Sequence, residues 1–66
     1  MMNLAEMIST LSDGEERALM RLRYLGGHRI KDIAASTRMS ERNVQRILRQ
    51  AKNELKEKYP HDFHLD

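Results

Sequence analysis

The stretch that decides the fold is residues 30–58, IKDIAASTRMSERNVQRILRQAKNELKEK, in which two apolar stripes are separated by a short polar connection. In the short first part, apolar residues recur at steps of three and four, as on the buried face of a helix: Ile30, Ile33 and Ala34. The long second part repeats this spacing in Val44, Ile47, Leu48, Ala51 and Leu55. Ser40 is a typical N-cap for a helix predicted over 41–58, and Pro60 ends it. Two helices joined so closely predict a helix-turn-helix.

A helix-turn-helix holds its two helices at a steep angle, which requires small side chains where the backbones approach each other. Ala34 and Ala35 meet that requirement on the short helix. Met39 is predicted to fill the corner beneath the connection, and Val44 to anchor the long helix on the short one.

Two further helices are predicted upstream. Residues 3–11 place apolar residues at helical spacing, namely Leu4, Met7, Ile8 and Leu11. Ser12 with Glu15 three residues later has the form of a capping box, which starts the second helix near Asp13. The glycine pair at 26–27 is expected to end that helix. Its core face is predicted to consist of Ala18, Leu19, Leu22 and Leu25.

The chain is therefore expected to be a small all-α domain of three to four helices over residues 1–60, with a C-terminal tail at 61–66. In the tail, Phe63 and Leu65 are predicted to pack against the first helix or to fray. A domain of 66 residues buries only about 60% of its unfolded surface, and it has no cysteine for a disulfide or a thiolate zinc site. Stability must come from helix packing, a homodimer or a larger partner.

No cofactor, metal or enzymatic activity is expected. His61 and His64 lie three residues apart, but they lack the cysteines and the ordered scaffold of a zinc site. The sequence has no glycine-rich phosphate loop and no Ser/His/acid arrangement suited to catalysis. It also has no apolar run near the roughly 20 residues of a membrane span and no signal-peptide pattern at its start. A cytoplasmic protein is expected.

Positive charge is concentrated in the later part of the chain, although the formal net charge is only +2. Residues 38–58 hold seven basic residues against three acidic ones, whereas residues 1–20 hold one against four. This distribution favours contact between the later part and a polyanion. An ordinary solvated helix face is the alternative, but a face that serves only solubility more often mixes Glu and Lys.

The polar side of the helix predicted over 41–58 carries arginine, asparagine and glutamine, which form paired hydrogen bonds with base edges in the major groove. In helix-turn-helix docking the first part of the second helix meets the bases. We therefore assign base contacts to Arg42, Asn43, Gln45 and Arg46. Phosphate contacts, which position without specifying sequence, are assigned to Arg29, Lys31, Arg49 and Lys52. Double-stranded DNA is the expected partner.

In the order and spacing of its residues, the stretch 11–55 resembles region 4 of the sigma-70 family, particularly its extracytoplasmic-function branch. It is similar to the LuxR-type response-regulator domain almost as strongly. The matching residues are Leu11-Ser12, Glu16-Arg17, Leu22-Arg23-Tyr24-Leu25, Gly27, Asp32-Ile33-Ala34, Met39-Ser40, Val44, Leu48, Ala51 and Leu55. The resemblance implies three or four helices that read promoter DNA in a bacterium or phage and, in sigma factors, also contact RNA polymerase.

Two positions in the turn depart from the family pattern, which has leucine where Thr37 lies and usually glycine where Arg38 lies. Arginine at positive φ is mildly strained, so a different form of turn is expected here. No sigma region 2 accompanies the domain. If these residues are the complete protein, it is expected to be a stand-alone regulator, or a module that mimics or modifies a sigma factor.

A second interpretation is a protein-interaction module that mimics region 4 and binds RNA polymerase or a regulatory protein. The acidic stretch from Glu6 to Glu16 would then face a basic partner. If DNA is the ligand, a homodimer on a palindromic or direct-repeat site is one arrangement, because a lone domain recognises few base pairs. The DNA-binding end of a recombinase is a third interpretation, which requires an appended catalytic domain.

Overall fold

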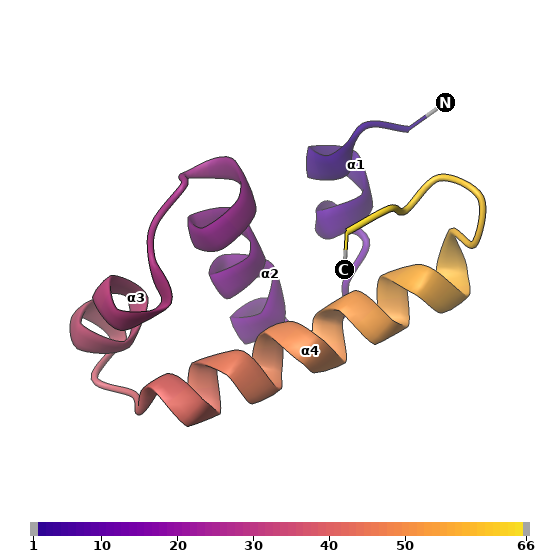
Figure 1. Cartoon of the computed structure of the whole chain (residues 1–66). Helices are drawn as coiled ribbons and strands as arrows, with labels where there is room; N and C mark the ends of the chain where they lie inside the picture. Colours follow the sequence, from indigo (N-terminus) through magenta and orange to yellow (C-terminus); the bar gives the residue numbers. More distant parts are fainter. Residues whose placement is uncertain (1, 66) are drawn as a thin grey trace.

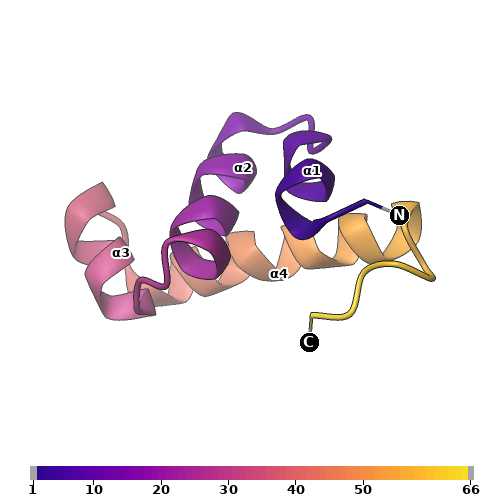
Figure 2. The ribbon, with the colours of Figure 1, turned by 90° about the horizontal axis from the view of Figure 1, so that it is seen from above.

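The computed structural model describes residues 2–65, and all regular structure in that range is helical. Its elements are α1 (Leu4–Ser9), α2 (Gly14–Met20), the π-helical segment η1 (Arg21–Leu25), α3 (Ile30–Thr37) and α4 (Glu41–Lys58). Figure 1 shows α4 running along one side of the molecule, with α1 beside its C-terminal half, α2 beside its middle and α3 at its N-terminal end. Figure 2 shows the same order from above. The all-α class and the helix-turn-helix of α3 and α4 are confirmed.

The first two helices begin with different caps. At α1, the side chain of Asn3 accepts from the backbone N–H of Glu6 at 2.8 Å, and the Glu6 carboxylate accepts from the Asn3 N–H at 3.2 Å. At α2, the predicted capping box of Ser12 and Glu15 is wrong. Asp13 is the N-cap, and its carboxylate accepts from the second and third N–H groups after it at 2.8 and 3.3 Å. A carboxylate there also interacts favourably with the helix dipole.

The second predicted helix is divided between α2 and η1, and only part of its expected core face is buried. Leu19 is buried and Leu22 partly so, but Ala18 is exposed and Leu25 is 49% exposed, while Met20 is in the core. The buried face is thus centred one position later than predicted. A backbone hydrogen bond of 2.8 Å spanning five residues closes the wider turn of η1, so a stripe extrapolated at about 100° per residue fails there.

The core lies between the apolar stripe of α4 and the sides of α1, α2 and α3 that face it. All five predicted stripe residues of α4 are buried. Phe63 is 5% exposed and lies with Leu4 and Met7 of α1, which confirms the predicted packing of the tail against the first helix. The boundary proposed at residue 60 stays a prediction. The buried residues are Met7, Ile8, Leu11, Leu19, Met20, Ile33, Ala34, Val44, Ile47, Leu48, Ala51, Leu55 and Phe63.

Three of the four residues predicted to set the helix-turn-helix angle are in the core or against it. Ala34 and Val44 are buried, and Met39 is partly buried against them. The prediction for Ala35 is wrong, because this residue is exposed. It lies about 100° further around α3 than Ala34, which turns it away from α4.

The connection between α3 and α4 contains a left-handed residue despite the arginine there. Arg38 has φ 58° and ψ 37°, and the N–H of Met39 donates to the carbonyl of Ala34 at 3.0 Å. The expectation of a different turn is therefore wrong. The left-handed conformation costs a non-glycine residue about 1–2 kcal/mol. At this end of α3 the hydroxyl of Thr37 also donates to the carbonyl of Ile33 at 2.6 Å.

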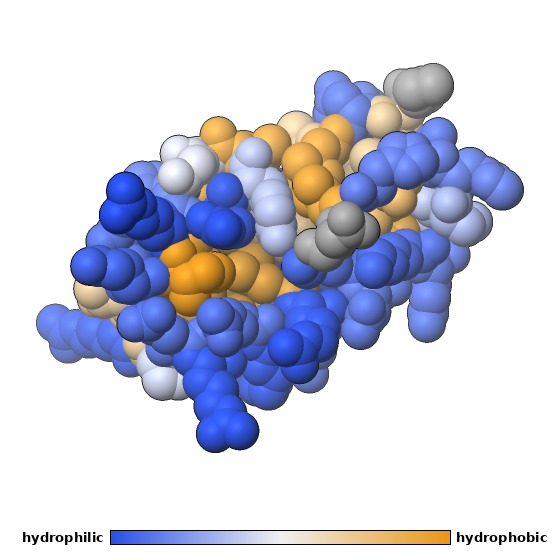
Figure 3. Space-filling model, viewed as in Figure 1, coloured by the Kyte–Doolittle hydropathy of each residue, from blue (hydrophilic) through white to orange (hydrophobic). Residues whose placement is uncertain are grey.

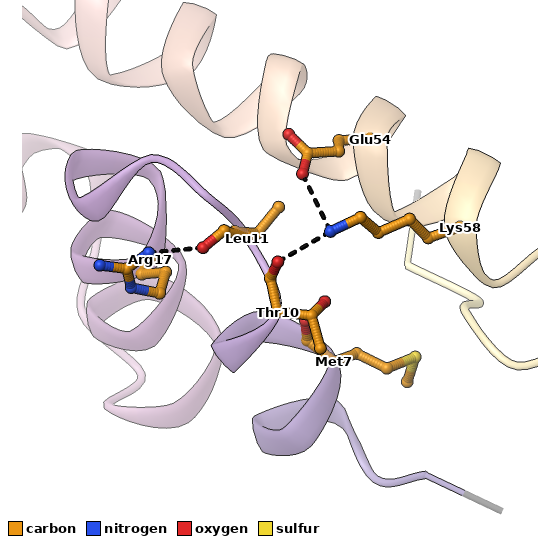
Figure 4. A network of polar contacts seen from close by, with 6 residues as sticks. All are labelled: Met7, Thr10, Leu11, Arg17, Glu54 and Lys58. Atoms are coloured by element: carbon orange, nitrogen blue, oxygen red, sulfur yellow. Dashed lines mark hydrogen bonds and ion pairs between the residues drawn. The ribbon is translucent and has the colours of Figure 1, made fainter.

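Long basic side chains join α1 to the rest of the domain. The Nζ atom of Lys58 donates to the Thr10 carbonyl at 2.7 Å and lies 3.3 Å from Oε2 of Glu54 (Figure 4). In the same region, Nη1 of Arg17 donates to the Leu11 carbonyl. Carbonyls at the end of a helix lack helical partners, so these bonds satisfy groups that would otherwise need water. The C-terminal half of α4 therefore has a structural role.

Candidate nucleic-acid interface

The second helix of the helix-turn-helix, α4, has its polar side exposed over its N-terminal half. The helix begins as predicted, with Oγ of Ser40 accepting from the Asn43 N–H at 3.0 Å. Because the opposite side, with Val44, packs into the core, Arg42 and Arg46 are exposed. Figure 3 shows hydrophilic side chains along the α4 edge of the molecule, with apolar ones between the helices. The predicted interface is therefore accessible to a ligand.

Four of the predicted residues line one hollow on α4, named here the first hollow: Arg42, Gln45, Arg46 and Arg49. The sequence assigned the first three to bases and Arg49 to phosphate. Gln45 and Arg46 follow Arg42 by three and four residues, and Arg49 follows them by four and three, so the set spans neighbouring turns. Within residues 2–65, none of the three arginines forms an ion pair. The first hollow therefore concentrates positive charge and hydrogen-bond donors.

Asn43, the remaining residue assigned to bases, differs from the other three. It is half-buried rather than exposed, and it does not line the first hollow. Its Oδ1 atom accepts hydrogen bonds from Nε and Nη2 of Arg46 at 3.1 and 2.5 Å. The structure thus places Asn43 beside a predicted base-contacting residue, with its own acceptor already used.

A second hollow lies between η1, the start of α3 and α4. Gln45 and Arg49 line both hollows, so the two are adjacent. Lys52 adds an ammonium group whose Nζ lies 5.9 Å from the centroid of the Tyr24 ring, within the range of a cation–π interaction. The full lining is Arg23, Tyr24, Ile30, Gln45, Leu48, Arg49 and Lys52.

Sequence reasoning did not include Arg23, which lines the second hollow. Its Nη1 donates to the carbonyl of His28 at 2.9 Å, across a turn in which Gly27 has φ 71°. The one available signal was its place among the basic residues of 21–37. The π-helical turn that brings Arg23 to the side of α4 does not follow from a period of 3.6 residues.

The two residues predicted to hold the flanking DNA strand lie at the start of α3. Arg29 is the N-cap residue and Lys31 is in the first turn, and both are exposed. Neither lines a hollow, but Ile30 between them lines the second. Arg29 and Lys31 are therefore exposed next to a lining residue in the sequence, without lining either hollow themselves.

Acidic side chains gather near the other end of α4. Glu54 lies twelve residues after Arg42, or about 18 Å along the helix. Burial, followed by the charges of Glu54 and Asp13, raises the pKa of Glu16, and Oε1 of Glu16 is buried without a hydrogen-bond partner among residues 2–65. Glu16 and Glu54 thus place negative charge where α2 packs on the C-terminal half of α4, whereas the N-terminal half carries three arginines against one acid, Glu41.

The tail histidines show no metal-binding arrangement. His61 and His64 are exposed, and among residues 2–65 no three His, Cys, Asp or Glu side chains are grouped so as to hold a metal ion. Over the same residues, no helix is both long enough and apolar enough to span a bilayer.

A helix-turn-helix with exposed arginines on its second helix defines a DNA-binding class of domain. The family model described as sigma-70, region 4, matches residues 1–55, so the chain belongs to the sigma-70 region 4 family. Domains of this family are non-catalytic DNA-binding modules. Searches among curated proteins and among solved structures found no match. The sigma-70 part of the resemblance is confirmed, and the LuxR-type part stays a prediction.

Proposed function

We propose that the domain is a sequence-specific transcription regulator that places the N-terminal half of α4 in the major groove of double-stranded DNA. The observation that carries this proposal is the first hollow, with three exposed arginines and a glutamine on neighbouring turns. The major groove admits an α-helix, and these side chains match the hydrogen-bonding groups of guanine and adenine there. Family membership supports DNA as the ligand.

The two hollows divide the contacts between bases and backbone. Arg42, Gln45 and Arg46 contact base edges from the first hollow. The second hollow and the start of α3 follow the phosphates of one strand, where contacts set the register of the helix without reading sequence. The residues with this role are Arg23, Arg29, Lys31, Arg49 and Lys52.

A single α4 spans few base pairs, and specific recognition usually needs a second module. Two copies of this chain on a palindromic or direct-repeat site would supply one. Simultaneous contact with RNA polymerase, a partner in keeping with family membership, is the other route. The preferred DNA site distinguishes them, because two copies require two half-sites, palindromic or directly repeated, whereas a domain bound together with RNA polymerase requires only one.

A second candidate function is a module whose main ligand is a protein, either RNA polymerase or a regulatory protein. The observation that favours it is the acidic surface on the first two helices, where Glu6, Asp13 and Glu15 are exposed. Such a surface is complementary in charge to a basic protein. DNA binding by α4 would then be secondary to protein binding.

Charge reversal on α4 tests the choice between these functions. We expect the DNA affinity of the wild type to fall steeply with salt. We expect the double variant Arg42→Glu/Arg46→Glu to bind its preferred site on the order of a hundredfold more weakly, since each paired base contact contributes about 1–3 kcal/mol. The matched control is Arg21→Glu/Lys56→Glu, which makes the same change in net charge at exposed positions outside both hollows.

Fluorescence anisotropy with a DNA site obtained by selection measures these affinities. Equal weakening by both double variants would contradict the proposal, because net charge and not the face of α4 would then control binding. A wild type that binds RNA polymerase unaffected by the α4 variants, and shows no salt-dependent DNA binding, would support the second candidate.

A further inference from the structure

Arg46 is held by the side chain three residues before it. Oδ1 of Asn43 accepts from Nε of Arg46 at 3.1 Å and from Nη2 at 2.5 Å. Residues three apart are neighbours on a helix surface. Asn43 is itself fixed at the start of α4, because its backbone N–H donates to Oγ of Ser40 at 3.0 Å and its side chain is half-buried. The arginine is thus tied to a well-anchored part of the backbone.

The contact leaves one edge of the Arg46 guanidinium unused. The group carries five N–H donors in a planar fork, and Asn43 takes the edge formed by Nε and the near side of Nη2. The end edge still has one N–H of Nη1 and one of Nη2 pointing in parallel. This pair matches the O6 and N7 acceptors of guanine. Asn43 draws the group toward the start of α4, the part that meets the bases in helix-turn-helix docking.

We propose that Asn43 is a positioning residue for Arg46, and that the pair gives α4 a preference for guanine at the base facing Arg46. The inference rests on the proposed function and names the base that the site selects. It departs from the sequence expectation that Asn43 contacts a base itself. Paired recognition of adenine needs the amide oxygen as an acceptor, and both lone pairs of this oxygen are engaged by Arg46.

Holding the arginine before DNA arrives lowers the cost of binding. A long side chain loses rotamer freedom when it is fixed at an interface. In this chain part of that ordering has already taken place in the free protein, through two hydrogen bonds to one oxygen. Removal of Asn43 should therefore weaken the selection of guanine without removing the arginine that makes it.

The test uses the full chain and a DNA site found by selection, with each position then changed to the other three bases. Arg46→Ala should abolish the preference for guanine at one position. Asn43→Ala should reduce that preference about three- to tenfold, a fraction of what one paired contact provides. The salt dependence of DNA affinity should be the same in Asn43→Ala as in the wild type, because this substitution alters no charge. Asn53→Ala, at an exposed asparagine on the same helix, is the matched control and should leave the preference intact.

The conservative variant Asn43→Asp separates positioning from direct contact with a base. Its carboxylate accepts the same two hydrogen bonds more strongly, so the preference for guanine should survive while a new negative charge near phosphates lowers affinity for every sequence. A circular dichroism melt checks that each variant is folded. An undiminished guanine preference in Asn43→Ala, or a loss of selectivity at a different base pair, would overturn the proposal.

Failure of this inference and failure of the proposed function give different results. If the wild type binds DNA but shows no guanine preference that depends on Arg46, the inference is overturned and the proposed function is not. If the wild type binds no DNA, the inference and the proposed function are both overturned. The free protein gives an independent measurement. The Nε–H signal of Arg46 in an NMR spectrum should be protected from exchange in the wild type and unprotected in Asn43→Ala. Equal exchange rates of the Arg46 Nε–H in the wild type and in Asn43→Ala would also overturn the inference.

Discussion

The two halves of α4 use similar charged side chains in different ways. In the C-terminal half, Lys58 pairs with Glu54 and donates to a carbonyl at the end of α1. In the N-terminal half, Arg42 and Arg46 are exposed and have no acidic partner within residues 2–65. One helix thus joins the domain together at one end and presents donors to a ligand at the other. The two halves differ in what their charged side chains contact, and this difference is not visible in the number of charges.

Truncation of the buried side in the C-terminal half should have the largest effect. Leu55 is fully buried, and Leu→Ala at such sites costs about 2–5 kcal/mol. Because a domain of this size has a total stability of only about 3–5 kcal/mol, Leu55→Ala should be largely unfolded at 25 °C by circular dichroism. Arg42→Ala, on the exposed side, should stay within about 0.5 kcal/mol of the wild type. A Leu55→Ala protein as stable as the wild type would contradict the core described here.

Removal of the link between α4 and α1 should have a smaller effect. Lys58→Met keeps the aliphatic stem but loses the bond from Nζ to the Thr10 carbonyl. A single hydrogen bond at a partly exposed site contributes about 0.5–1.5 kcal/mol, and the accompanying ion pair contributes little. Urea unfolding should show this loss, with DNA affinity unchanged once the protein is folded. The control is Lys56→Met at a neighbouring exposed position, and equal destabilisation by both would remove the structural role of Lys58.

The smallest expected effect concerns pH. Burial, with the charges of Glu54 and Asp13, raises the pKa of Glu16 above its ordinary value of 4.5. The folded state therefore binds a proton more readily than the unfolded state, and stability from this group is present at acidic pH and declines as pH rises through the raised pKa. On moving from pH 7 to pH 5, the wild type should gain stability relative to Glu16→Gln, by less than about 0.5 kcal/mol. Glu15→Gln, at an exposed neighbouring position, should show the same change in stability between pH 7 and pH 5 as the wild type. A loss of stability in the wild type relative to Glu16→Gln over this range would contradict a raised pKa at Glu16.

The fold followed from the sequence where the apolar period was regular. The stripe of α4 has the α-helical spacing throughout, so its five buried residues and both ends of the helix were predicted. Prediction failed for Ala18 and Leu25, which are exposed, because the buried face was placed one residue early and no local signal marks the π-helical turn. The left-handed Arg38 was also missed, since packing of the two flanking helices outweighs the strain of one residue.

The candidate site was predictable as a set of residues but not as an arrangement. Arg42, Gln45 and Arg46 lie together on α4, and their spacing in the sequence was enough to predict this. The contribution of Arg23 depends on the path of η1, and the pairing of Asn43 with Arg46 depends on rotamers. A hydrophobic pattern contains neither the path of η1 nor the rotamers of the side chains.

The central claim is that the N-terminal half of α4 is the surface that meets DNA. Titration of the isotopically labelled chain with its selected duplex, followed by NMR, tests it most directly. The side-chain signals of Arg42, Gln45 and Arg46 should shift strongly, with smaller changes at Arg23 and Lys52 and none at the link between Lys58 and α1. Shifts confined to α1 and the start of α2, with α4 unchanged, would contradict the claim.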